Sequence, residues 1–331
     1  MTTITSAVRA VRVPRFGTGS SSLPVWLVLA LMTAVSWLVV SRSGGAFLSA
    51  QNMQNIGGRS VALGLVAVGQ AVVVLAGSLD LSVAYTVSIA AVTASVAMAG
   101  DPSRMPLGVA AGLAVGAAVG LVNGLAVTGL GLNAFIATFA VSLIVRGALN
   151  ATFDNFAGKV PERFQAIGYD AVAGVPVGLL LLAAVVAVSW YLMHRTRFGY
   201  HVYAVGGDPQ VARTSGIRVN RTLIAAHVLC GACAGLGGLF LASRLGAGAP
   251  WVGPQGGYDL DSIAAVVLGG VALAGGRGRL LGAIAAVLMF GVLDSVFNHL
   301  AVDPFLRTLV RGLIIVGAVA LYARRRGQER A

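Results

Sequence analysis

The stretch LGVAAGLAVGAAVGLVNGLAVT, residues 107–128, contains 22 residues and no charged side chain. A helix needs about 20 apolar residues to cross roughly 30 Å of hydrocarbon, so this stretch is long enough to span a bilayer. Its many glycines and alanines are typical of membrane helices that pack closely, because small side chains let the backbones approach. The stretch therefore predicts a transmembrane helix.

The whole chain has the same apolar character. Of its 331 residues, 57% are hydrophobic and only 10% are charged, and the net charge is +12. A soluble protein carries about 25% charged residues, so this chain cannot cover a surface that faces water. Its basic residues lie between the apolar blocks and at the two ends. This placement indicates membrane topology and argues against nucleic-acid binding.

Ten apolar segments predict an all-α, polytopic bundle of about ten transmembrane helices. Two predictions are weak: the pair 58–76 and 82–99, which residues 77–80 separate, and 258–274, which is short and begins with acids. Broken or re-entrant helices are the alternative at both places. The ten segments are 24–41, 58–76, 82–99, 107–128, 133–151, 174–193, 222–243, 258–274, 280–298 and 304–323.

The arginines indicate the orientation of the bundle. With both ends in the cytoplasm, fourteen arginines fall inside and about six basic residues fall outside, as the positive-inside rule expects. Residues 1–23 are then a cytoplasmic N-terminal segment, 24–323 the transmembrane domain and 324–331 a basic cytoplasmic tail. The loop 194–221 falls inside, and the loop 152–173 falls outside.

The chain also repeats itself weakly. The motif FIAT at 135–138 matches FLRT at 305–308, and residues 77–81 match 256–260 in Gly-x-x-Asp-Leu. These offsets map each predicted helix of the first half onto the helix five places later. Because five is an odd number, the two halves would run in opposite directions through the membrane. The pattern predicts an inverted repeat, which is common in transporters. Chance similarity between helices rich in glycine and alanine is the alternative.

Four of the polar residues inside or beside the apolar segments are candidate pathway residues. An ionisable group at membrane depth costs about 2.5–3.5 kcal/mol, so Asp80, Asp259 and Asp261 each require an explanation. Glycines precede these acids, and the two interpretations are capping of a helix start and lining of a polar pathway. Asn123 either bonds a neighbouring helix or contacts a polar solute.

Sequence motifs for catalysis are absent from the chain. It contains no H-E-x-x-H, no G-x-S-x-G and no G-x-x-x-x-G-K-[ST] motif. Cys230 and Cys233 are interpreted as small residues in a packed helix. We therefore expect a protein that is not an enzyme and holds no cofactor; if ATP drives it, another chain binds the ATP.

The loop 194–221 contains a short predicted helix. Asp208 can serve as its N-cap and Pro209 as its first residue, and Gly216 ends it after about seven residues. A capped helix that carries an arginine is shaped to press into a groove of a partner. An ordinary solvated connection is the alternative.

Four segments resemble the membrane-spanning permease subunits of bacterial ABC sugar importers, which serve ribose, xylose, arabinose and galactose. The resemblance implies the ABC importer permease fold in the bacterial inner membrane. It also implies a second permease copy or paralogue, a cytoplasmic ATPase that uses ATP and Mg²⁺, and an extracytoplasmic sugar-binding protein. The segments are AGSLDLSVAYTVSIAAV (76–92), GLVNGLAVTGLGLNAFIATFAVSLIVRG (120–147), TRFGYHVYAVGGDPQVARTSGIRVNR (196–221) and GGYDLDSIAAVVLGGVALAGGRGRLLGA (256–283).

The resemblance also implies roles for individual residues. The short helix of the loop 194–221 would be the coupling element that docks on the ATPase, and the motifs around the three acids would belong to the translocation core. The coupling residues are Gly207, Asp208, Ala212, Arg213 and Gly216, and the pathway or gate residues are Asp80, Asn123, Asp259 and Asp261.

Other functions stay open at this point. The chain could be an ABC permease for a nucleoside, a signalling furanose or a branched-chain amino acid. A secondary transporter driven by an ion gradient would need carboxylates inside the helices and no partner ATPase, and Asp294 is the only acid clearly inside a predicted helix. A membrane enzyme is a third class, but it lacks a recognisable site.

Overall fold

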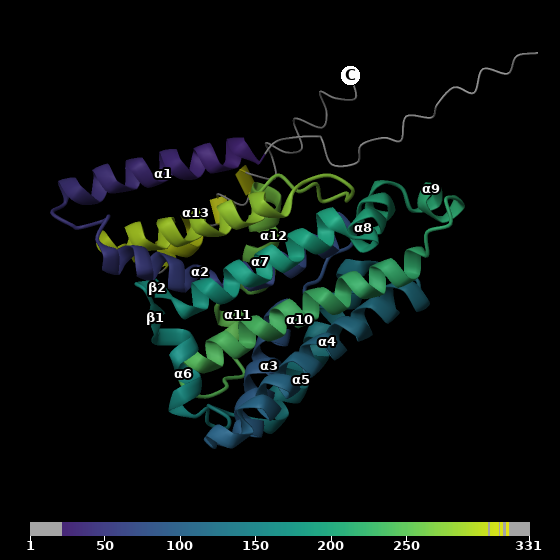
Figure 1. The fold of residues 1–331 in the computed structure, drawn as a ribbon, viewed down its shortest axis with the longest axis horizontal. Helices are drawn as coiled ribbons and strands as arrows, with labels where there is room; N and C mark the ends of the chain where they lie inside the picture. The colour runs from purple at the N-terminus through teal and green to yellow at the C-terminus, as the bar shows by residue number, and fades with distance from the viewer. Residues whose placement is uncertain (1–21, 304, 311, 314–315, 318–331) are drawn as a thin grey trace, which may run out of the picture.

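The computed structural model describes residues 22–303, 305–310, 312–313 and 316–317. Long helices run side by side and make up most of the bundle (Figure 1). They are α1 (Leu23–Arg42), α2 (Ala50–Leu75), α3 (Val83–Met98), α4 (Met105–Gly129), α5 (Ala134–Thr152), α7 (Val177–Arg195), α10 (Val219–Leu245) and α13 (Leu280–His299). The shorter helix α12 (Tyr258–Leu268) packs against α2 and α13.

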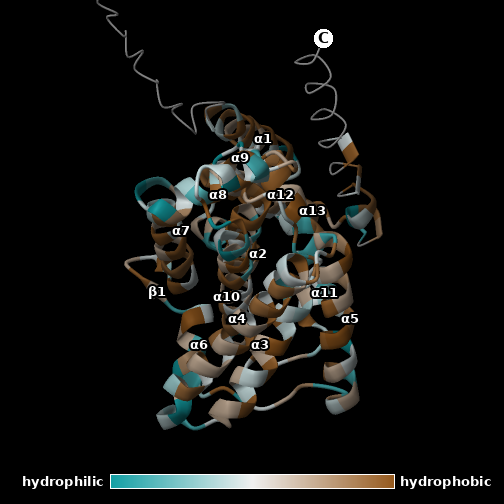
Figure 2. Ribbon diagram, turned by 90° about the vertical axis from the view of Figure 1, so that its right-hand side faces the viewer, coloured by the Kyte–Doolittle hydropathy of each residue, from teal (hydrophilic) through white to brown (hydrophobic). Residues whose placement is uncertain are grey.

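Within the described residues, seven helices are long and apolar enough to cross a membrane: α1, α2, α4, α5, α7, α10 and α13. They are mostly brown in Figure 2, the colour of hydrophobic residues. The predicted all-α membrane bundle is confirmed, but a count of about ten spanning helices is not. The 16 residues of α3 and the 11 of α12 extend only about 24 and 16 Å.

The prediction of a continuous helix over 258–274 is wrong. The helix α12 ends at Leu268, and residues 269–279 form an irregular loop. The cause is the glycine content of this loop, since Gly270, Gly275 and Gly276 all have positive φ. Such backbone conformations suit glycine and cannot continue a right-handed helix.

The predicted start of the second helix is also wrong, because α2 begins at Ala50 and not at residue 58. The Ser49 side chain caps α2 by accepting a hydrogen bond from the Asn52 amide. Asn52 in turn donates to the Phe47 carbonyl at 2.7 Å and accepts from Ser295 Oγ at 2.8 Å. These partners allow a polar first turn to lie inside the bundle.

Three predictions fall on residues that the structure does not describe or describes only in part. The tail 324–331 lies outside the described residues, and so does 1–23 apart from its last two positions. Of the candidate helix 304–323, the described residues are helical. The second copy of the predicted repeat extends into this segment, so the inverted repeat stays a prediction.

The helices α4 and α10 are in close backbone contact. Glycines recur at every fourth position of α4, from Gly108 to Gly124. A Cβ atom at Gly116 would lie 2.5 Å from the carbonyl oxygen of Gly231, and one at Gly120 would clash with that of His227. Glycine is therefore required for these two backbones to approach, as in other tightly packed membrane helices.

The two longer loops lie at opposite ends of the bundle (Figure 1). The loop 194–221 folds into two helices that follow α7, and the loop 152–173 contains a helix and the first strand of a two-stranded antiparallel hairpin. The short elements of the chain are η1 (Pro102–Arg104), α6 (Glu162–Tyr169), β1 (Ala171–Val172), β2 (Val175–Pro176), α8 (Arg197–Gly207), α9 (Pro209–Thr214) and α11 (Val252–Gln255).

Candidate functional site

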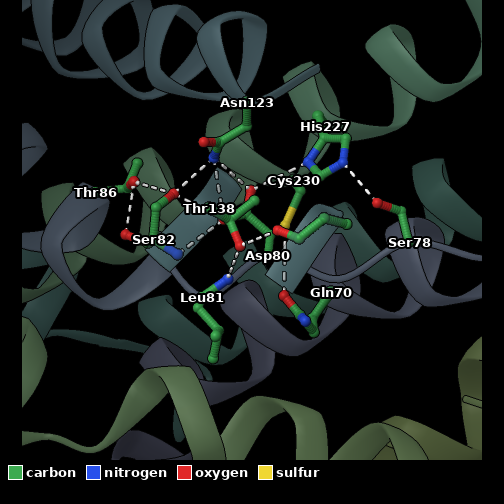
Figure 3. A network of polar contacts seen from close by, with 11 residues as sticks. Gln70, Ser78, Asp80, Leu81, Ser82, Thr86, Asn123, Thr138, His227 and Cys230 are labelled. Atoms are coloured by element: carbon green, nitrogen blue, oxygen red, sulfur yellow. Dashed lines mark hydrogen bonds and ion pairs between the residues drawn. The ribbon is translucent and has the colours of Figure 1, made fainter. Parts of the chain in front are cut away.

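Asp80 lies in the α2–α3 link, residues 76–82, and is only 1% exposed. Its Oδ1 accepts hydrogen bonds from the Ser82 amide at 2.9 Å and from Ser82 Oγ at 2.7 Å. The Asn123 amide nitrogen, on α4, donates to both carboxylate oxygens at 3.1 Å each (Figure 3). The structure thus brings together two of the predicted pathway residues.

His227 joins the same group from α10, and it is fully buried. Its Nδ1 lies 3.4 Å from Asp80 Oδ2, and its Nε2 lies 2.9 Å from Ser78 Oγ (Figure 3). Ser78 and Asp80 both belong to the α2–α3 link. One histidine ring therefore holds the link at two points.

A third long helix contributes Thr138, which is fully buried on α5. Its Oγ1 accepts a hydrogen bond from the Leu81 backbone amide at 3.0 Å. A buried polar group is stable only with partners, and here the partners come from α4, α5 and α10 around one irregular link. We call the residues Ser78, Asp80, Ser82, Asn123, Thr138 and His227 the polar network.

The polar network lies near the end of the bundle that carries α8 and α9. Asn123 is six residues before the end of α4, and His227 is eight residues after the start of α10. At 1.5 Å per residue these positions are about 9 and 12 Å from the helix ends. The network therefore lies inside the bundle but not at its middle.

Two buried amides keep unused hydrogen-bonding atoms. Among the described residues, Asn123 Oδ1 and Gln70 Nε2 have no partner. Cys230 Sγ donates to Gln70 Oε1 at 3.8 Å. A free amide acceptor such as Asn123 Oδ1 is suited to a hydroxyl donor, but the residue is fully buried in this conformation. A solute would reach it only after the surrounding helices separate.

The other two predicted pathway acids lie on α12. Asp261 is buried in the first turn, where the positive end of the helix dipole favours a carboxylate. Asp259 Oδ1 accepts from the Leu260 amide at 2.9 Å. Neither acid is among the labelled residues of Figure 3. Their assignment to a pathway stays a prediction.

The helix α9 forms as the local sequence predicts. Asp208 Oδ1 accepts hydrogen bonds from the amides of Gln210 at 2.8 Å and Val211 at 3.1 Å, and Pro209 is the first helical residue. Gly216 has φ +82°, the left-handed conformation that terminates helices. The helix has six residues, one fewer than the predicted length of about seven.

A groove of about 920 Å³ lies between α9, α8 and the end of α7. Its lining is largely apolar, with basic side chains near the helix junctions. The lining residues are His194, Arg195, Thr196, Arg197, Tyr200, His201, Ala204, Gly207, Asp208, Val211, Ala212, Ser215 and Ile217.

The predicted coupling residues differ in their solvent exposure. Gly207, Asp208 and Arg213 are exposed. Ala212 is buried and packs with Val205 and Val219, so it anchors α9 to the bundle and cannot itself meet a partner.

Sequence reasoning missed the residues whose roles depend on distant partners. His227 was one such residue, and its signal was a histidine within a long apolar helix. Ser78 and Thr138 carried no comparable signal. On α9 it missed Val211, which is 60% exposed beside Arg213 and adds an apolar contact surface.

The fold and the site define a class of protein. It is a polytopic membrane protein with an ionisable pair inside its bundle, and ionisable residues inside membrane helices mark functional sites. The described residues contain no group of three or more His, Cys, Asp or Glu that could hold a metal ion. The chain belongs to the family described as the permease component of the branched-chain amino acid transport system, and the match covers residues 52–319.

Several relatives are similar over most of their length. The chain is 36% identical to the ribose import permease protein RbsC of Escherichia coli (strain K12), over 88% of this chain and 91% of the relative. It is 40% identical to the L-arabinose transport system permease protein AraH of the same strain, over 81% of each. It is 31% identical to the galactose/methyl galactoside import permease protein MglC of the same strain, over 91% of this chain and 95% of the relative. No solved structure matches the chain.

Proposed function

We propose that this chain is the membrane-spanning subunit of an ATP-driven importer for a monosaccharide. The observation that carries the proposal is the similarity to permeases named for ribose, L-arabinose and galactose, which covers 81–95% of those relatives. The family match over residues 52–319 includes most of the helices and the surface helix together, and not one common motif.

In this proposal the chain works with three kinds of partner. A second permease subunit completes the pathway, an extracytoplasmic binding protein delivers the sugar, and a cytoplasmic ATPase hydrolyses ATP with Mg²⁺. The permease itself catalyses no reaction. The end with α8 and α9 faces the cytoplasm, because arginines gather there in accordance with the positive-inside rule.

The helix α9 is the part that receives the ATPase. Its exposed face presents Val211 and Arg213. Ala212 packs α9 against the bundle, and the Asp208 cap stabilises its first turn. A docking helix needs this combination, because a loosely held helix would move without moving the bundle. ATP binding then changes which side of the pathway is open by favouring one of two conformations.

The pathway residues have two tasks in this proposal. Asp80 and Asn123 hold the α2–α3 link in the conformation described, and Asn123 offers its free oxygen to a sugar hydroxyl when the helices separate. Asp259 and Asp261 line the gate at the start of α12.

Uptake of radiolabelled solutes tests the proposed substrate class. A strain that lacks its own pentose and hexose importers would express the chain with its cognate ATPase and binding protein. We expect uptake of ribose, L-arabinose or galactose, abolished when the ATPase is inactive. Leucine is the comparison solute, because the family description names branched-chain amino acids. Uptake of leucine alone, or uptake of sugar without an active ATPase, would contradict the proposal.

Charge reversal on α9 tests the docking surface. We expect Arg213→Glu to reduce recovery of the ATPase with the purified permease by about tenfold, as the loss of a well-placed interfacial charge does. Arg163→Glu is the matched control, since Arg163 is also exposed but lies on α6 at the other end. If both variants retained the ATPase equally, α9 would not be the docking element.

A further inference from the structure

The α2–α3 link touches the end of α8 through backbone contacts between glycines. Gly77 has φ +81°, and a Cβ atom there would lie 3.5 Å from the Cα of Gly206. A Cβ atom at Gly206 would clash with the carbonyl oxygen of Leu75, at the end of α2. The contact at Gly206 leaves no room for a side chain, and we infer that movement of α8 is transmitted to the link directly.

The loop after α12 closes around the same point. The Gly276 amide donates to the Leu75 carbonyl at 2.9 Å. Tyr203 of α8 donates its hydroxyl to the Gly278 carbonyl at 3.0 Å, and burial raises the pKa of this tyrosine. α8, the link and this loop thus form one packed contact at the end of the bundle.

This contact lies next to α9 along the chain. Gly206 is two residues before Asp208, the N-cap of α9. Consecutive Cα atoms are 3.8 Å apart, so the two positions are separated by less than about 8 Å. A displacement of α9 is therefore transmitted to Gly206 through very little intervening chain.

The other side of the link is held by the polar network. His227 contacts Ser78 and Asp80, which are respectively one and three residues beyond Gly77. Asn123 fixes Asp80 from α4, so the link is joined to both α4 and α10. α10 and α4 are themselves in close glycine contact, which makes the two helices one unit.

We propose that the α2–α3 link carries the movement of α9 into the bundle, and that His227 is the positioning residue that ties the link to α10 while it moves. This inference rests on the proposed function, because the ATPase supplies the movement. Without the ring of His227 the link slides past α10, and hydrolysis no longer drives the change of access. His227 acts through Ser78 and Asp80 and does not contact the sugar.

The side-chain chemistry offers a graded set of variants. His227→Ala removes both contacts. In His227→Asn the amide nitrogen takes the place of Nδ1 and keeps the contact with Asp80. In His227→Gln it takes the place of Nε2 and keeps the contact with Ser78. The matched control is Thr222→Val, a buried position on α10 whose hydroxyl donates to the carbonyl of Arg218, the N-cap of the same helix.

The experiment measures ATP hydrolysis and sugar uptake by the same reconstituted complex of permease, ATPase and binding protein. For His227→Ala we expect hydrolysis within about twofold of the unchanged complex and about a tenfold loss of sugar imported per ATP, the scale of a coupling interaction. His227→Asn and His227→Gln restore part of the ratio, and Thr222→Val leaves it unchanged.

Hydrolysis and uptake that fall in parallel, or a ratio that does not change, would overturn the positioning role. If His227→Ala does not assemble, Ser78→Ala supplies the test, because it removes one contact and leaves Asp80 paired; an unchanged ratio there also rejects the role. Failure of the proposed function is distinct, since the unchanged complex would then show no ATP-dependent uptake at all.

Discussion

The polar network and the outer face of the helix α9 differ in how far their side chains are exposed. In the network every residue is buried, and Asp80 is held by partners from several helices. On α9 the side chains of Val211 and Arg213 face outward beside an open groove. Groups that are satisfied inside the chain maintain its shape, whereas exposed groups on a firmly anchored helix are available to a partner.

Removal of Asp80 is expected to have the largest effect on stability. Asp80→Ala removes the carboxylate that Asn123 and His227 contact, and each buried polar group left short of a partner costs about 1–3 kcal/mol. We expect a marked fall in the thermal unfolding midpoint in detergent, with a smaller fall for Asp80→Asn. Asp154→Ala is the control, because Asp154 is an exposed acid. An unaltered midpoint for Asp80→Ala would show that the network does not maintain the fold.

Two adjacent glycines in the last turn of α8 allow a buried position to be compared with an exposed one. Gly206→Ala should destabilise the protein by about 1–3 kcal/mol, because its new methyl group meets the backbone of Leu75 and Gly276. Gly207→Ala should change stability by less than about 0.5 kcal/mol, since nothing lies within 4 Å of a Cβ atom at this position. Thermal unfolding of the two variants tests the contrast, and equal midpoints would contradict the described contact.

The cap of α9 is expected to have a modest, local effect. Asp208→Ala removes the acceptor for two amides and should weaken α9 by about 1 kcal/mol, whereas Asp208→Ser keeps a capping oxygen. Hydrogen exchange of the α9 amides should rise in the alanine variant alone. Faster exchange across α10 as well would mean that the cap supports more of the bundle than its contacts indicate.

Features set by neighbouring residues were predictable from the sequence. The order Asp208, Pro209 and Gly216 specifies a cap, a first turn and a stop, and the structure has all three. The long apolar runs likewise gave most helices within three residues, because lipid thickness and hydropathy fix their length. The start of α2 was an exception, since its polar first turn depends on Ser295, far along the chain.

Features set by distant contacts were not predictable from the sequence. His227 and Asp80 are 147 residues apart, and the packing of α10 against α2 and α3 brings them together. The early end of α12 had a local signal in its run of glycines, but the contact of Gly275 with Gly77 and Gly206 had none. Sequence patterns identify such residues singly and do not pair them.

Chemical labelling of introduced cysteines tests most directly whether α9 is accessible to a partner in the conformation in which the polar network is buried. Val211→Cys and Ser82→Cys would each be made in a chain whose buried Cys230 and Cys233 are replaced by alanine. In inside-out membrane vesicles, an impermeant maleimide should label the cysteine at 211 rapidly and the one at 82 not at all. Added ATPase should protect position 211. Equal labelling of both positions, or labelling at 211 that the ATPase leaves unchanged, would contradict this account.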